Sequence, residues 1–181
     1  MSKKILVTYA SGFGTTKEIA EYIAKVFTEN ELDVEVLPAA DVRDIAKYNG
    51  VVLGASIRAG NLLPQAVDFA SRFKHALAKV PIAAFVVCLT MQEDTDENRK
   101  IVSCWLNPLR EIITPFDTGY FAGQLIYKHL PFSERLLAQL MKQPEGDHRD
   151  WDKIRVWAMG LLPVLSGATC PVTGSDEKSV C

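Results

Sequence analysis

Hydroxyl-bearing residues and glycines are concentrated in a short loop near the N-terminus, between an apolar run at residues 5–7 and a helical pattern at residues 18–24. The loop residues that could do chemistry are Ser11, Gly12, Phe13, Gly14, Thr15 and Thr16. A strand that leads through such a loop into a helix N-terminus presents unpaired N–H groups and the positive end of the helix dipole. The sequence therefore predicts a site for a phosphorylated cofactor.

The loop matches neither of two common nucleotide motifs. A P-loop requires lysine after its last glycine, but Thr15 follows Gly14, and Lys17 stands where a dinucleotide fingerprint requires its third glycine. Hydroxyls and backbone amides suit one terminal phosphate better than a metal-bridged triphosphate. The alternative is an N-capped helix that follows an ordinary turn.

The elements that must position this loop alternate along the chain. Strands are predicted at residues 4–9, 34–37, 50–55, 81–89 and 116–122. Helices are predicted at residues 14–29, 63–78, 95–113 and 150–162, with a short turn near residues 42–47. This order indicates an α/β fold with a doubly wound, five-stranded parallel sheet and helices on both faces.

Ligands of such sheets bind beyond the carboxyl ends of the strands, where the strand order reverses. Two further loops should meet the first one there. The loop after the third strand contains Ser56, Ile57, Arg58, Ala59, Gly60 and Asn61. The loop after the fourth strand contains Thr90, Met91, Gln92 and Glu93.

Composition limits the class of protein. The chain of 181 residues is 48% hydrophobic, which fits one domain, predicted over residues 1–165. A formal charge of −2 with mixed signs provides no basic stripe for nucleic acid. Because no apolar run is long enough to span a membrane and residues 1–4 lead into a strand, we expect a cytoplasmic protein.

The four cysteines have no metal-binding spacing, and no metal is predicted. Cys88 and Cys104 lie in predicted core elements and are expected to be buried free thiols. Cys170 and Cys181 lie in a tail, residues 166–181, that is expected to be irregular. A redox or intermolecular role for the tail cysteines is the alternative, which a reducing cytoplasm disfavours.

The chain resembles the flavodoxin family, with Ser11, Gly14 and Thr16 on the pattern of its phosphate loop. The stretch at residues 51–58, which contains Gly-Ala-Ser-Ile-Arg, and the stretch at residues 145–151 resemble the flavodoxin-type, menaquinone-dependent protoporphyrinogen IX dehydrogenases and their uncharacterised relatives. The resemblance covers residues 1–165, including an insertion at about 124–149 that is shorter than usual in that family. Ala59 also stands where the family usually has an aromatic residue.

The resemblance implies that flavin mononucleotide (FMN) is the cofactor. Its phosphate would lie on the first loop, and its ring would lie between the loops at residues 56–61 and 90–92. Arg58 would then stabilise the reduced ring near its N1 and C2 carbonyl edge, although a solvated or carboxylate-paired arginine is the alternative. Gly60 could let a peptide reorient toward N5 or serve as a turn glycine, and Thr90 and Met91 could contact the ring or pack at a strand end.

The insertion contains a predicted helix that starts at Ser133. Its apolar residues Leu136, Leu137, Leu140 and Met141 form one stripe. We expect this stripe to pack on its own domain, and a lid, a dimer contact or a membrane-surface contact are the alternatives.

Five residues in or beside the insertion have simpler expected roles. His129 and His148 are expected in loops, with proton transfer as the alternative. Asp150 should cap the last helix and Trp151 should pack on the core, whereas Asp147 is assigned no chemistry.

Two functions of different kind follow from the resemblance. One is a quinone-linked dehydrogenase of the protoporphyrinogen oxidase type, and the other is a one-electron carrier that docks to redox partner proteins. Typical carriers are strongly acidic, so the small net charge favours the enzyme. A quinone reductase with a nicotinamide donor is a third interpretation, without a second nucleotide fingerprint to support it.

Overall fold

The computed structural model describes residues 3–126, 128, 131–140 and 145–167. Five parallel strands form its central sheet in the order β2-β1-β3-β5-β6. The strands are β1 (Lys4–Ala10), β2 (Asp33–Pro38), β3 (Gly50–Arg58), β5 (Ile82–Cys88) and β6 (Thr118–Ala122). The predicted doubly wound α/β fold is confirmed, and the order reverses between β1 and β3.

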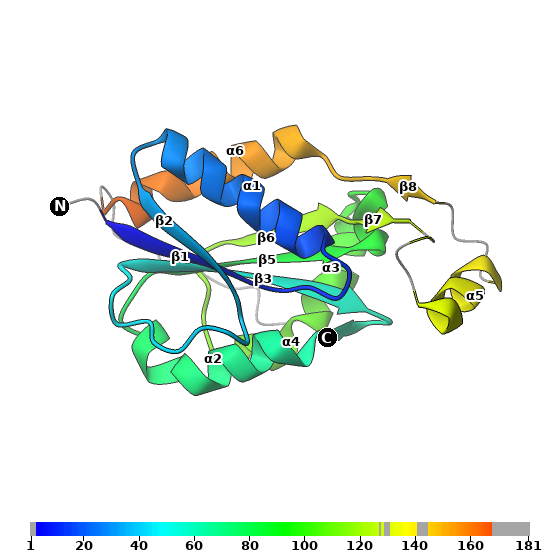
Figure 1. The fold of residues 1–181 in the computed structure, drawn as a ribbon, viewed down its shortest axis with the longest axis horizontal. Coiled ribbons are helices and arrows are strands. Elements are labelled where there is room, and N and C mark those ends of the chain that lie inside the picture. The colour runs from blue at the N-terminus through cyan, green and yellow to red at the C-terminus, as the bar shows by residue number, and fades with distance from the viewer. Residues whose placement is uncertain (1–2, 127, 129–130, 141–144, 168–181) are drawn as a thin grey trace.

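Helices cover both faces of this sheet (Figure 1). On one face, α1 (Thr15–Glu29) and α6 (Trp151–Leu165) pack over Ile5 and Val7 of β1. On the other, α2 (Pro64–Leu77), α3 (Asp96–Trp105) and α4 (Asn107–Arg110) share a core with Leu6. Because successive side chains of a strand point to opposite faces, a nearly continuous apolar strand supplies both cores.

The predicted single helix at residues 95–113 is wrong, because the chain divides it into α3 and α4 at Leu106. Pro108 occupies the first turn of α4. Proline lacks a backbone N–H and its ring would clash with the carbonyl four residues earlier, so α3 cannot continue through this position.

Three short strands were not predicted. β4 (Asn61–Leu62) pairs antiparallel with the end of β3, and β7 (Gln124–Leu125) pairs antiparallel with β8 (Gly146–Asp147) at the base of the predicted insertion. Between β7 and β8 lies α5 (Phe132–Leu140), beyond the carboxyl edge of the main sheet (Figure 1).

The prediction that the insertion helix packs on its own domain is wrong for the side chains that the structure describes. Phe132, Leu136 and Leu140 of α5 are all exposed. The reason is the position of α5. The chain leaves the body of the domain after β7, forms α5, and returns at β8 (Figure 1). Leu137 and Met141 are not among the described side chains.

Several other predictions also fall outside the described residues. These concern His129, Cys170, Cys181 and the tail from residue 168 onward. In the part of the chain that is described, no helix combines the length and the apolar character needed to cross a membrane.

Candidate functional site

The first loop places an uncapped helix N-terminus at the carboxyl end of β1. Gly14 is the N-cap residue of α1 and has a left-handed backbone with φ 90°. No side chain caps α1, and whether the loop holds a phosphate or is an ordinary turn before a helix stays a prediction. Ser11 Oγ instead accepts a hydrogen bond of 3.0 Å from Gly14 N, which holds the loop closed and leaves the first-turn N–H groups of α1 for a ligand.

The hydroxyls of this loop have different surroundings. Thr16 is fully buried, and its Oγ1 lies 2.6 Å from Ser56 Oγ at the end of β3. This bond joins the first loop to the second, so Thr16 supports the site rather than facing outward. Ser11 and Thr15 are half-buried and remain the hydroxyls nearest to the surface.

The second predicted loop is largely a β-hairpin. β3 continues through Arg58, and only Ala59 and Gly60 separate it from β4. Their φ values of 47° and 76° are both positive, which is typical of a type I′ turn. Gly60 therefore lies in a tight turn, and its reorientation toward a flavin stays a prediction.

Two contacts hold this turn. Asn61 Nδ2 donates a 3.0 Å hydrogen bond to the carbonyl of Ala59. A Cβ atom on Gly60 would lie 3.2 Å from Nε1 of Trp105, so the indole of α3 packs directly on the turn. The sequence analysis missed Trp105 because no local pattern connects residue 105 with residue 60.

Arg58 extends from β3 over the first loop. Its Cζ lies 4.5 Å from the centroid of the Phe13 ring, and a Cβ on Gly12 would lie 3.2 Å from its Nη1. A guanidinium above an aromatic face is a favourable cation–π arrangement. The structure therefore brings Arg58, Gly12 and Phe13 together, while the neighbouring Ile57 is buried in the core.

The third loop is a 3₁₀ turn, η1 (Leu89–Gln92), at the end of β5. Met91 is buried in the core, which is the strand-end packing of the alternative interpretation, whereas Thr90 is half-buried and Gln92 is exposed. Asn98 of α3 holds the turn, because its Nδ2 donates to the carbonyls of Thr90 at 3.1 Å and Glu93 at 2.8 Å. Asn98 was not predicted as part of the site.

The two described cysteines differ. Cys88 is a buried free thiol, as predicted, and desolvation is the main cause that raises its pKa. Cys104 takes part in a disulfide, so the prediction of a free thiol there is wrong. The expectation rested on the place of Cys104 in a predicted core element, whereas its side chain is only half-buried and disulfide formation depends on which side chains the fold brings within reach.

An ionic network fixes the chain just after η1. Asp94 binds Arg99 of α3 at 2.6 Å and also pairs with Lys153 of α6. The hydrogen bond from Arg99 is the main cause that lowers the pKa of Asp94 to about 2. The network therefore joins the end of the third loop to helices from both faces of the sheet.

We expect Asp94→Asn to lower the free energy of unfolding by about 1 kcal/mol at neutral pH. A carboxyl with a pKa of about 2 when folded and about 3.9 when unfolded contributes stability above pH 4. That contribution is lost as the pH falls toward 2, so the two proteins should converge there. Urea unfolding between pH 2 and pH 7 measures the difference, and a difference that persists at pH 2 would contradict this ionic role.

Arg149 connects the base of the insertion to α1. Its side chain is 7% exposed, binds Asp147 at 2.6 Å and pairs with Glu18 in the first turn of α1. Its Cζ also lies 4.7 Å from the Trp151 ring, which in turn packs on Tyr22. Hydrogen bonding to Asp147 is the main cause that raises the pKa of Arg149, so the guanidinium remains charged.

Three residues beside Arg149 lie where the sequence predicted them. Asp150 caps α6 as predicted, since its Oδ1 accepts a 2.9 Å hydrogen bond from Lys153 N. Trp151 packs against the core on the α1 side, also as predicted. His148 follows β8, where its backbone N donates to Gly123 O at 3.2 Å and its Nε2 is buried without a partner.

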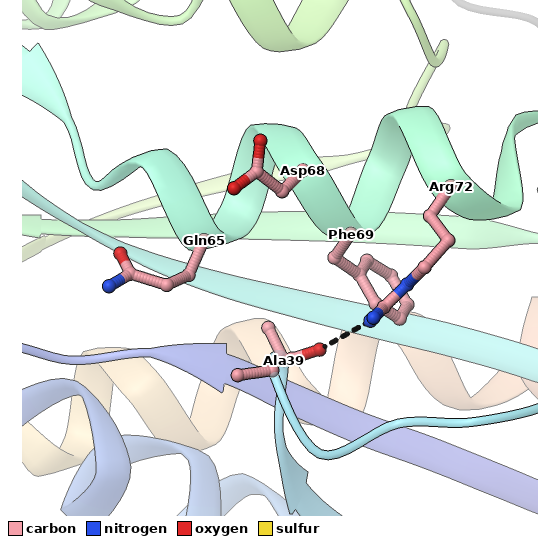
Figure 2. A pocket seen from close by; sticks show the side chains of 6 residues that line it. Ala39, Gln65, Asp68, Phe69 and Arg72 are labelled. Atoms are coloured by element: carbon pink, nitrogen blue, oxygen red, sulfur yellow. Dashed lines mark hydrogen bonds between the residues drawn. The ribbon is translucent and has the colours of Figure 1, made fainter.

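A hollow of about 190 Å³ lies between α2 and the segment that follows β2 (Figure 2). Gln65, Asp68, Phe69 and Arg72 line it from α2, opposite Ala39. Figure 2 shows Arg72 reaching across to the carbonyl of Ala39, a hydrogen bond of 2.9 Å. None of the predicted site residues lines this hollow, so it has no part in the predicted cofactor site.

The fold and the three loops define a class of protein: a doubly wound α/β protein with a helix N-terminus that no side chain caps at the strand-order switch. Proteins of this class bind their ligands at that switch. The flavodoxin domain model matches residues 6–152, and the chain belongs to this family.

Named relatives and solved structures agree with this assignment. Protoporphyrinogen IX dehydrogenase [quinone] of Leishmania major is 29% identical, over 98% of this chain and 83% of that protein. The protein of the same name from Escherichia coli K12 is 26% identical, over 83% and 84% of the two chains. A flavodoxin of Streptococcus pneumoniae has a similar fold, with a TM-score of 0.55 and 15% identity over 92% of this chain and 99% of that one.

Proposed function

We propose that the chain binds FMN and acts as a quinone-linked dehydrogenase of the protoporphyrinogen-oxidising type. The observation that carries the proposal is the uncapped N-terminus of α1, which opens beside the β3–β4 turn at the switch point of the sheet. The names of two relatives, both protoporphyrinogen IX dehydrogenase [quinone], support the choice of reaction.

The residues of the first loop fit a phosphate without a metal ion. Ser11 and Thr15 offer half-buried hydroxyls, Gly12 and Phe13 are exposed, and the space at the Cβ position of Gly14 is open, so the backbone of the loop would be open to a phosphate. Thr16 would act indirectly, because its bond to Ser56 holds the loop against β3. The first-turn N–H groups of α1 would complete the set of donors.

The other two loops would hold the isoalloxazine ring. The proposed contacts come from the residues of the β3–β4 turn and of η1, which are Ser56, Ile57, Arg58, Ala59, Gly60, Asn61, Thr90, Met91 and Gln92. Buried Ile57 and Met91 would contribute through their backbone or as packing behind the ring. Bound FMN would accept electron pairs from the substrate and pass them to a quinone.

A one-electron carrier is the second candidate. Its support is the fold, which the chain shares with flavodoxins. The formal charge of −2 favours the dehydrogenase, because a carrier that docks to basic partners gains from a strongly acidic surface.

The proposal is tested by titrating the purified protein with FMN and then reducing it stepwise without oxygen. Saturable uptake followed by reduction in two-electron steps supports the dehydrogenase, and an assay with protoporphyrinogen IX and menaquinone should then show turnover. Reduction in separate one-electron steps without turnover supports the carrier. Absence of FMN binding would overturn both candidates.

Arg58→Ala should lower the two-electron midpoint potential of the bound flavin. A cation beside the pyrimidine edge favours the reduced, more negative cofactor, and one charge-assisted hydrogen bond of about 1.5 to 3 kcal/mol corresponds to about 30 to 60 mV. Spectroelectrochemical titration measures the potential. Arg58→Lys is the matched control, because it keeps the charge and should retain most of the potential. An unchanged potential in Arg58→Ala would remove this role.

A further inference from the structure

The helix α5 carries exposed apolar side chains that have no role in the proposed chemistry. Phe132, Leu136 and Leu140 are 83%, 49% and 72% exposed. Residues four apart lie on the same side of a helix, so these three side chains form one apolar stripe, named here the α5 stripe. Single exposed apolar residues are common, but a continuous stripe on a short helix indicates a contact surface.

Positive charge accompanies the α5 stripe. Arg135 of α5 and Lys128 just before the helix are both exposed. In the sequence, the insertion at residues 124–149 contains four cations, Lys128, Arg135, Lys142 and Arg149, and three acids, Glu134, Glu145 and Asp147, although the whole chain has a formal charge of −2. This local excess of cations complements an anionic surface.

The size of α5 argues against a second copy of the chain as the occupant. A helix of nine residues is about 13 Å long, whereas stable protein dimers bury roughly 1,200 to 2,000 Å² in total. The α5 stripe could supply only a small part of such an interface, and a symmetric pair would bring like charges together. A lipid surface needs no shaped partner, because an amphipathic helix inserts its apolar face only about 5–10 Å.

We propose that α5 docks the protein on the surface of an anionic phospholipid bilayer, with the α5 stripe inserted among the lipids and Lys128 and Arg135 at the headgroups. β7 and β8 connect α5 to the carboxyl edge of the sheet, which also carries the three loops (Figure 1). Docking would therefore bring that edge to the bilayer, where a lipid-soluble quinone resides. The docking does not depend on the proposed reaction.

Hydrogen bonds and ion pairs hold the base of the insertion against the domain. Arg149 binds Asp147 of β8 and Glu18 of α1, so β8 at the base of the insertion is joined to the first helix of the site through charged hydrogen bonds. His148 N also donates to Gly123 O beside β7. These contacts support the orientation of the insertion relative to the sheet.

The test is co-sedimentation of the full chain with vesicles, first of phosphatidylcholine alone and then with phosphatidylglycerol added. We expect binding to the anionic vesicles. Combined replacement of Phe132, Leu136 and Leu140 by serine should weaken it at least about tenfold. Arg135→Glu should weaken binding only to the anionic vesicles. The control is Val156→Ser with Met159→Ser on α6, which removes apolar side chains that are 72% and 41% exposed and should leave lipid binding unchanged.

Three outcomes would contradict the proposal that α5 docks on a bilayer. They are absence of wild-type binding to anionic vesicles, equal binding by the α5 variant, and self-association that disappears in the α5 variant without any lipid binding. Circular dichroism confirms that each variant folds. FMN titration of the α5 variant in solution separates this proposal from the proposed function, because cofactor binding should be retained when lipid binding is lost.

Discussion

Replacing Gly54 with alanine should lower the free energy of unfolding by about 3 kcal/mol, near the upper end of typical overpacking costs. Gly54 lies at the centre of β3, opposite Phe85 of β5. A Cβ atom at Gly54 would lie 2.2 Å from Phe85 Cζ, inside the space of the ring. Phe85 is itself fully buried and packs against Phe121 and Trp157, with both pairs of ring centroids 6.0 Å apart.

Urea unfolding followed by circular dichroism measures the Gly54→Ala effect. Gly160→Ala is the matched control, because Gly160 lies within α6 with no atom within 4 Å of its Cβ position. Removing a helical glycine there should raise stability by about 0.5 to 1 kcal/mol. Adding Phe85→Leu to Gly54→Ala should restore part of the loss. A loss below about 0.5 kcal/mol in Gly54→Ala would show that the ring can move aside.

Thr15→Asp should weaken FMN binding about 100-fold while leaving riboflavin binding unchanged. Thr15 is the first residue of α1 and is half-buried beside the proposed phosphate site. A carboxylate about 4 Å from a phosphate would cost about 3 kcal/mol at an intermediate dielectric, which corresponds to about two powers of ten in affinity. The same carboxylate is favourable for α1, because acidic residues stabilise helix N-termini.

Fluorescence titrations with FMN and with riboflavin, which lacks the phosphate, measure the two affinities. Thr15→Asn is the control for size and hydrogen bonding without charge, and it should bind FMN much more tightly than Thr15→Asp. Added salt should narrow the gap between the two variants. Equal FMN affinities in Thr15→Asp and the wild-type protein would place the phosphate elsewhere. Equal loss of both ligands would indicate damage to the ring site instead.

The buried strands and the first loop could be read from the sequence because their signals are local. The apolar run before Ser11 and the glycine at position 14 predict a strand, a turn and a helix start from neighbouring residues alone. Repetition of strand and helix then leaves few topologies, since crossovers between parallel strands are right-handed. This rule and the parallel strands place the loops that follow the strands at one edge of the sheet, but the strand order itself came from the structure.

Interactions between residues far apart in the sequence required the tertiary structure. Arg149 meets Glu18 across 131 positions, and Trp105 packs on Gly60, although neither pair has a local pattern. The exposure of α5 is of the same kind, because an apolar stripe predicts burial and does not say whether the chain places anything against it. Local patterns thus predicted the five parallel strands and the helices α1, α2 and α6, and they indicated a loop for a phosphate, but they missed β4, β7, β8 and the division between α3 and α4. The contacts that support this loop join residues far apart in the sequence, so they could be identified only in the folded chain. The same is true of the exposed apolar face of α5, because exposure depends on how the packed elements are placed in space.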